Sequence, residues 1–124
     1  MEHIRYSVAA CQVDMPNPVE RRAMRANTDR MLSMIDSAVA GAAPFLPVRL
    51  VVFPEFAHSA PVFETASELI EKLAITIPND HTERLQQKAR EHDIYIQSGS
   101  LLEVDPKWPG HVFNTTCLIG PNEI

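Results

Sequence analysis

Glu55 is the residue with the clearest capacity for chemistry, because it lies just beyond an apolar run. Residues 48–53 (VRLVVF) predict a buried strand, and Pro54 ends it. In open α/β sheets, ligands bind beyond the carboxyl ends of the strands, so Glu55 is predicted to face such a crevice. If the flanking Phe53, Pro54 and Phe56 exclude water, they would favour the neutral carboxyl and strengthen Glu55 as a base. On spacing alone, a solvated loop glutamate or a charge at a helix start is the alternative.

The cysteines and histidines are weaker candidates for chemistry than Glu55. Both cysteines, Cys11 and Cys117, lie in apolar runs that predict buried strands, and we interpret them as structural thiols. No pair of ligand-type residues has the spacing of a metal site, so no metal is predicted. His58 follows Glu55 by three residues and could line a pocket, but a solvated loop histidine is the interpretation we favour. None of the five histidines is assigned a role.

Asn114 and Trp108 can each be explained by their immediate surroundings in the fold. Asn114-Thr115-Thr116 is formally a glycosylation sequon, but it lies inside a predicted strand. We interpret Asn114 as a strand-end side chain that satisfies backbone groups. Trp108, between two prolines, could anchor a subunit contact, border the substrate or cover the local core.

The order of predicted elements indicates an α/β fold. Asn17 and Pro18 predict the start of the first helix, and Gly41 predicts its end. Thr65 and Asp80 begin the capping patterns of two later helices. The last two strands suggest an antiparallel pair around the turn-forming residues 105–110, and right-handed crossovers are expected between parallel neighbours. The predicted strands are 5–13, 48–53, 94–104 and 112–119, and the predicted helices are 17–41, 65–73 and 80–92.

Composition excludes several classes of protein. The chain has 124 residues, of which 45% are hydrophobic and 22% charged, as expected for one soluble globular domain. A net charge of −5 without a basic cluster argues against a nucleic-acid partner. No apolar run reaches the ~18 residues of a membrane span, and the first residues lack the apolar stretch of a signal peptide, so a cytoplasmic location is expected. Residues 14–17 (DMPN) stand where a nucleotide-binding fold has its glycine-rich loop, which makes that class a weak alternative.

Several short motifs together resemble the nitrilase superfamily of carbon–nitrogen hydrolases. The strand-ending FPEF at 53–56 resembles the first catalytic motif of that family. AACQV at 9–13, Asn27 in the first helix, Gly99-Ser100, and VFNTT at 112–116 followed by Gly120 resemble further family segments in the same order. Each motif is weak alone, but their order and spacing cover nearly the whole chain.

The resemblance implies an α-β-β-α sandwich, of which residues 1–124 form only the N-terminal part. It also implies hydrolysis of a small amide or nitrile by a Glu-Lys-Cys triad without a cofactor, in a homo-oligomer. Only Glu55 matches the triad, and the resemblance also allows Asn114 to form a hydrogen bond near the site. Lys72, Lys88 and Lys107 lie in other contexts, and the family places its Lys in a Tyr-Arg-Lys-like run shortly after the segment matching 120–124, with the Cys later. The 124 residues alone are therefore expected to be inactive and to expose an apolar sheet face.

A different class of function also fits the sequence. If the chain is a complete product, it would be a catalytically inactive α/β binding or interaction module. The motifs identify neither the substrate nor whether the activity would be that of an amidase or a nitrilase, because both use the same three groups.

Overall fold

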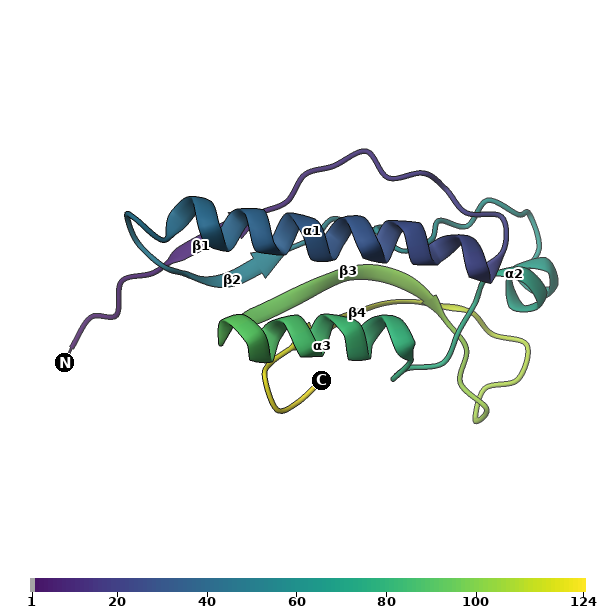
Figure 1. The fold of residues 1–124 in the computed structure, drawn as a ribbon. Coiled ribbons are helices and arrows are strands. Elements are labelled where there is room, and N and C mark those ends of the chain that lie inside the picture. The colour runs from purple at the N-terminus through teal and green to yellow at the C-terminus, as the bar shows by residue number, and fades with distance from the viewer. Residues whose placement is uncertain (1) are drawn as a thin grey trace.

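Strands and helices alternate as the sequence predicts. The computed structural model describes residues 2–124 and ends in an antiparallel hairpin (Figure 1). The elements are β1 (Ser7–Ala10), the 3-10 turn η1 (Arg21–Ala23), α1 (Met24–Ala42), β2 (Val48–Val52), α2 (Ala66–Lys72), α3 (Asp80–His92), β3 (Tyr95–Glu103) and β4 (Phe113–Ile119).

The four strands form one sheet in the order β1-β2-β3-β4. β1, β2 and β3 run parallel, and β4 returns antiparallel to β3, as the turn-rich loop between them predicted. The register of β3 against β4 shifts between Gln97 and Ser100, and Gly99 within this shift has φ +70. Such a bulge bends the strand and redirects neighbouring side chains, and bulges are common next to functional sites.

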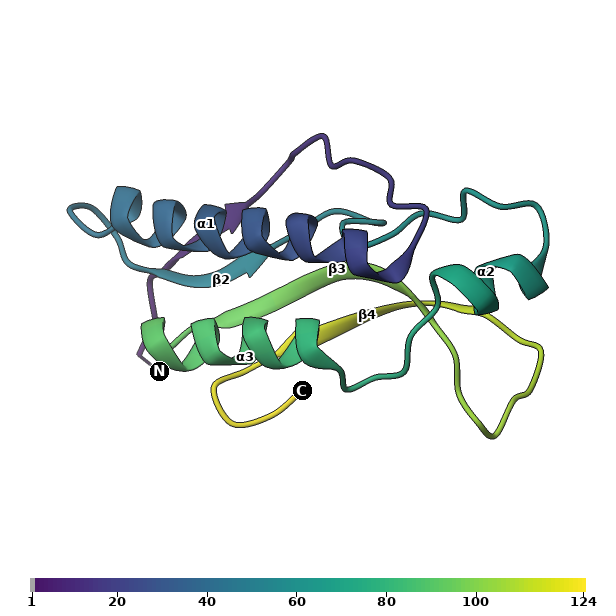
Figure 2. The same ribbon diagram turned by 45° about the vertical axis from the view of Figure 1, so that its right-hand side comes forward.

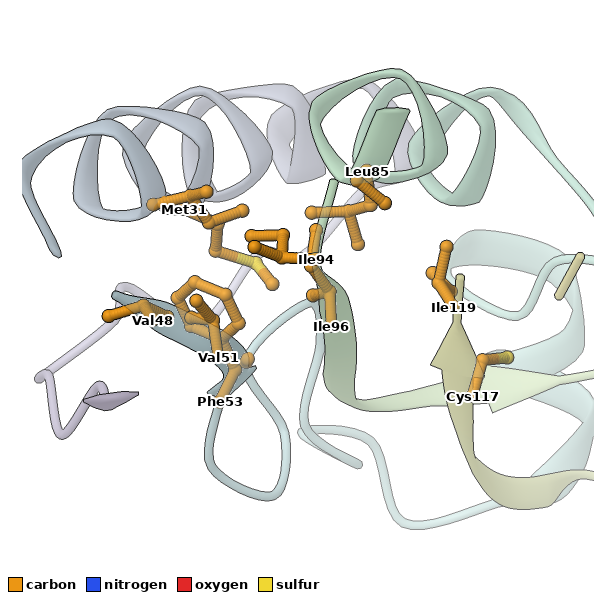
Figure 3. Close-up of a cluster of buried hydrophobic side chains, with 12 residues drawn as sticks. Met31, Val48, Val51, Phe53, Leu85, Ile94, Ile96, Cys117 and Ile119 are labelled. Carbon is orange, nitrogen blue, oxygen red and sulfur yellow. The ribbon is translucent and has the colours of Figure 1, made fainter. Parts of the chain in front are cut away.

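Both long helices cover the same face of the sheet (Figures 1 and 2). Met31 and Ile35 of α1 and Leu85 and Ala89 of α3 are completely buried, and they pack against the strands (Figure 3). The helical side chains recur at spacings of four residues, which places each pair on one side of its helix. The strand side of this core consists of Val48, Val51, Ile96, Cys117 and Ile119.

The opposite face of the sheet has no covering layer within the described residues. Val8, Tyr95 and Leu118 on this face are 51%, 46% and 55% exposed. The chain therefore shows one helical layer and one sheet, which is the arrangement of half an α-β-β-α sandwich. The expected α/β fold is confirmed, and so is the expected apolar sheet face. No helix in residues 2–124 combines the length and apolar character needed to cross a membrane.

The predicted start of the first helix is wrong. Asn17 is not its cap, since α1 begins at Met24 after the 3-10 turn, whereas its end at Ala42 lies one residue beyond the predicted Gly41. The second helix begins as expected, with Thr65 Oγ1 accepting from the backbone N–H of Glu68. The third helix is capped one residue earlier than expected, by Asn79.

The first strand is shorter and less buried than predicted. β1 covers four residues at the edge of the sheet, and its side chains alternate between half-buried and exposed. Cys11 lies beyond its end and is half-buried, whereas Cys117 in β4 is buried as expected. Successive side chains of a strand point to opposite faces, and only one face of this sheet is covered by helices, so alternate residues of the apolar run remain exposed.

Replacing Gly99 or Gly41 by alanine should change the free energy of unfolding in opposite directions. A Cβ at Gly99 would lie 2.5 Å from Pro54 O and 2.8 Å from Ala57 Cβ at a positive φ, so Gly99→Ala should lower the free energy of unfolding by on the order of 2–4 kcal/mol. A Cβ at Gly41 would meet nothing within 4 Å, so Gly41→Ala should raise it by about 0.5–1 kcal/mol. Urea denaturation of both variants measures the difference, and equal responses would contradict the close approach at Gly99.

Candidate active site

Glu55 lies in a turn immediately beyond the carboxyl end of β2, as the sequence predicts. Its side chain is exposed, so the neighbouring phenylalanines do not shield it from water in this chain. Asn114 Nδ2 on β4 donates a hydrogen bond of 2.8 Å to Glu55 Oε1. The interpretation that Asn114 satisfies backbone groups is therefore wrong, because its amide holds one oxygen of the carboxylate.

Glu55 borders a hollow of about 250 Å³ on the uncovered face of the sheet. Asn114, Thr116 and Leu118 alternate along β4, so they share the face that lies away from the helices. Gln97 Nε2 donates to Thr116 Oγ1 over 2.8 Å, which aligns the polar side chains of β3 and β4 beside Glu55. The hollow is lined by Phe53, Glu55, Gln97, Gly99, Ser100, Asn114 and Thr116.

The bulge of β3 fixes the turn that carries Glu55. Gly99 leaves room for the carbonyl of Pro54, which a Cβ at that position would meet at 2.5 Å. Ser100 Oγ then accepts a hydrogen bond of 2.7 Å from the backbone N–H of Phe56. Phe56 has φ +59, a conformation that a residue other than glycine keeps only when its surroundings hold it. The Gly99-Ser100 motif thus has a physical role in positioning the turn.

His58 anchors the same turn from inside the molecule. The prediction of a solvated histidine is wrong, because His58 is fully buried and its Nε2 lies 2.9 Å from the carbonyl oxygen of Ser98. A carbonyl accepts, so we assign the proton of the neutral ring to Nε2. Nδ1 has no hydrogen-bond partner among the described residues. Burial lowers the pKa of His58 to about 4, which keeps the ring neutral near pH 7.

Asn27 joins two loops beneath the site. It is 2% exposed, and its Nδ2 donates to Pro16 O at 2.9 Å and to His58 O at 3.2 Å. The resemblance singled out Asn27 without explaining it. The sequence does indicate that Asn27 is buried, because it lies three residues after Met24 and four before Met31, on the apolar side of its helix. An amide at such a position must find buried partners.

Neither cysteine has the features of a nucleophile. Burial raises the pKa of both Cys11 and Cys117, whereas a reactive thiol needs a lowered pKa. Within residues 2–124, neither a cysteine nor a lysine lines the hollow around Glu55. Of the residue types in the expected triad, the described site therefore contains the glutamate alone.

Two other features of the surface lie apart from this site. Asp36, Glu91 and His92 bring metal-ligand atoms within 4.8 Å of one another. However, Lys88 Nζ lies 2.9 Å from both oxygens of Asp36 and 3.0 Å from Glu91, so this group is an ion-pair network around an ammonium. A hollow of about 460 Å³ lies at the amino-terminal end of β3, beside Tyr95, and none of the residues around Glu55 borders it.

Comparison with known proteins extends these observations. A family model described as carbon-nitrogen hydrolase matches residues 7–124. The fold is similar to Saccharomyces cerevisiae Nit3, a member of branch 10 of the nitrilase superfamily, with a TM-score of 0.72 and 22% identity over 94% of this chain and 40% of that one. An N-terminal amidase crystallised with a Gln-Gly peptide gives a TM-score of 0.68 and 18% identity, over 92% of this chain and 25% of that one.

A third structure shows the same fold in a larger protein. A glutamine-dependent NAD(+) synthetase from Cytophaga hutchinsonii gives a TM-score of 0.58 and 17% identity, over 94% of this chain and 17% of that one. A search of curated protein sequences found no match to the chain. The chain thus spans less than half the length of each of these structures, and at these identities they show a common fold.

The burial of His58 predicts a pH dependence of stability. Its folded-state pKa near 4 lies below the ordinary value of about 6.5, so protons bind the unfolded chain more tightly. The free energy of unfolding should be highest above pH 6.5 and fall by roughly 2–3 kcal/mol toward pH 4.5. Burial also lowers the pKa of His81, so His81 should add to the fall in the free energy of unfolding.

Urea denaturation across this pH range measures the effect. In His58→Gln, the amide can still donate to Ser98 O but has no proton to gain, so the fall should become smaller. His3→Gln, which changes an exposed histidine, serves as the control and should leave the fall unchanged. If His58→Gln and the parent chain lose the same stability, His58 is not the titrating group.

Proposed function

Because the chain belongs to the carbon–nitrogen hydrolase family, we propose that it is the Glu55-bearing part of an enzyme that hydrolyses a small amide or nitrile. The observation that carries the proposal is the attachment of Glu55. Its turn is fixed at the carboxyl end of β2, and Asn114 holds Oε1 at 2.8 Å beside a hollow. A carboxylate with one oxygen held by a neutral donor has its other oxygen available to accept a proton in a defined direction.

The proposed mechanism uses Glu55 as a general base. Its carboxylate removes the proton from a cysteine thiol, and the thiolate attacks the amide carbon to form a tetrahedral intermediate. A lysine ammonium stabilises the negative charge on oxygen. Protonated Glu55 returns the proton to the leaving nitrogen, the C–N bond breaks, and a thioester remains. Glu55 then activates water, which attacks the thioester and releases the acid and the free thiol.

The open face of the sheet supports a site completed by further residues. Glu55 is exposed, whereas a general base acts best where water is excluded. The hollow around it lies on the sheet face that no described element covers. We propose that the second sheet of the sandwich covers this face and brings the lysine and the cysteine to Glu55. The predicted homo-oligomer and cytoplasmic location stay predictions of the family resemblance and of the sequence.

One observation favours the alternative of an inactive binding module. The hollow around Glu55 contains neither a cysteine nor a lysine within residues 2–124. In such a module, Glu55 and Asn114 would bind a polar ligand group without covalent chemistry.

The coding sequence distinguishes these two functions. We expect it to continue past Ile124 into a Tyr-Arg-Lys-like run and then to encode a cysteine after another strand. DNA sequencing beyond the codon for Ile124 checks this directly. A stop codon at that position would remove the proposed nucleophile and favour the binding module.

In the full-length protein, Glu55→Gln should abolish turnover while the fold is retained. Glutamine has nearly the same size and can still pair with Asn114, but it cannot accept the thiol proton. We expect ammonia release to fall by about two to four orders of magnitude, the usual contribution of a positioned base. The matched control is Glu64→Gln, which changes an exposed glutamate in the following loop and should leave turnover unchanged. Ammonia release by Glu55→Gln at the parent rate would exclude the assigned role.

A further inference from the structure

A second and more apolar hollow adjoins the one around Glu55. It has a volume of about 430 Å³, within the range of roughly 300–1,000 Å³ that is common for ligand pockets. It lies where α2 meets the loop between β3 and β4, and Figures 1 and 2 both show these segments at the same end of the sheet. Leu69 of α2 and Leu102 of β3, which are 9% and 3% exposed, form part of its wall and belong to a small separate core.

The two hollows share one lining residue. Asn114, which holds the carboxylate of Glu55, lines both of them. Glu55 lines the polar hollow, and Phe56, the next residue, lines the apolar one. The two hollows therefore lie next to each other, and a molecule whose reacting carbon lies beside Glu55 would direct a long substituent past Asn114 toward the apolar hollow.

The side chains that line the apolar hollow determine which kind of substrate substituent it can bind. Phe56, Leu69, Leu102, Val112 and Phe113 present apolar side chains, and no lysine, arginine, aspartate or glutamate lines the hollow within the described residues. Burying an alkyl or aryl group against such a wall is favourable by about 25 cal/mol per Å². The one titratable residue of the lining is His111, whose side chain is exposed. A carboxylate placed against the apolar wall would therefore lose its hydration without an ammonium or guanidinium partner, which costs several kcal/mol.

We propose that this hollow binds an alkyl or aryl group of the substrate, so that the enzyme prefers amides or nitriles with an uncharged apolar chain over those that carry a second carboxylate. For a primary amide or a nitrile, that chain is attached to the carbon under attack. The inference rests on the proposed function, because it takes Glu55 as the base beside the reacting carbon.

Ala66 provides the variant that tests the hollow. It is the first residue of α2, it is exposed, and it lines the apolar hollow, so a larger side chain there can fill the space without entering the core. Ser67, the next residue, is also exposed and does not line the hollow. Ala66→Trp and Ser67→Trp therefore form a matched pair at the start of one helix.

The experiment measures ammonia release by the full-length protein from hexanamide, succinamate and acetamide. The parent enzyme should have a kcat/KM for hexanamide about tenfold or more above that for succinamate. Ala66→Trp should lower kcat/KM for hexanamide by about tenfold, mainly through KM, and leave acetamide within about twofold, because acetamide does not reach the hollow. Ser67→Trp should change none of these values. A preference for succinamate, or equal effects of the two substitutions, would overturn the inference.

A binding measurement separates this inference from the proposed function. Calorimetric titration of hexanamide into full-length Glu55→Gln reports binding without turnover. If the parent releases ammonia neither from any of the amides nor from hexanenitrile, the proposed function fails. In that case, binding that Ala66→Trp weakens tenfold in the Glu55→Gln background and Ser67→Trp leaves intact still supports the apolar pocket. Absent binding, or equal binding by both double variants, overturns the pocket independently.

Discussion

The contact between Pro54 and Gly99 is the constraint on which the site depends. The Pro54 carbonyl oxygen approaches Gly99 so closely that a side chain at position 99 would overlap it at 2.5 Å. This approach brings the turn after β2 against the bulge of β3, where Ser100 Oγ can accept from Phe56 N–H. With these backbone atoms in place, Glu55 projects toward the face of the sheet that carries Asn114.

Buried polar groups hold the same turn from beneath. The ring of His58 bonds to the carbonyl of Ser98, and Asn27 bonds to the carbonyl of His58. Hydrogen bonds in a buried environment are costly to break, because the separated groups have no water to replace their partners. The exposed carboxylate of Glu55 thus follows a turn whose other side is held by buried hydrogen bonds.

The two faces of the sheet differ, because one is covered by helices and the other is open and partly polar. One face packs completely against α1 and α3, with Met31, Ile35 and Leu85 at 0% exposure. The other is polar beyond the carboxyl end of β2, where Glu55 meets Asn114, and apolar toward the amino end of β3, where Tyr95 is exposed. Such a face can bury its apolar part against a second layer while the polar part borders an enclosed reaction space. Asn114 lies where this polar part meets the apolar hollow near α2.

The sequence by itself determined the order of strands and helices, the antiparallel end of the sheet, the cap at Thr65 and the place of Glu55 beyond a strand. These features depend on short-range periodicity and on residues with strong local preferences. Only the tertiary structure decided that His58 is buried and that Asn114 pairs with Glu55, 59 residues away in the chain. Such pairings depend on the register of β3 against β4 and on the bulge at Gly99, which local patterns do not specify. The start of the first helix shows the same limit, because it is preceded by η1 and begins at Met24 rather than at the local signal of Asn17.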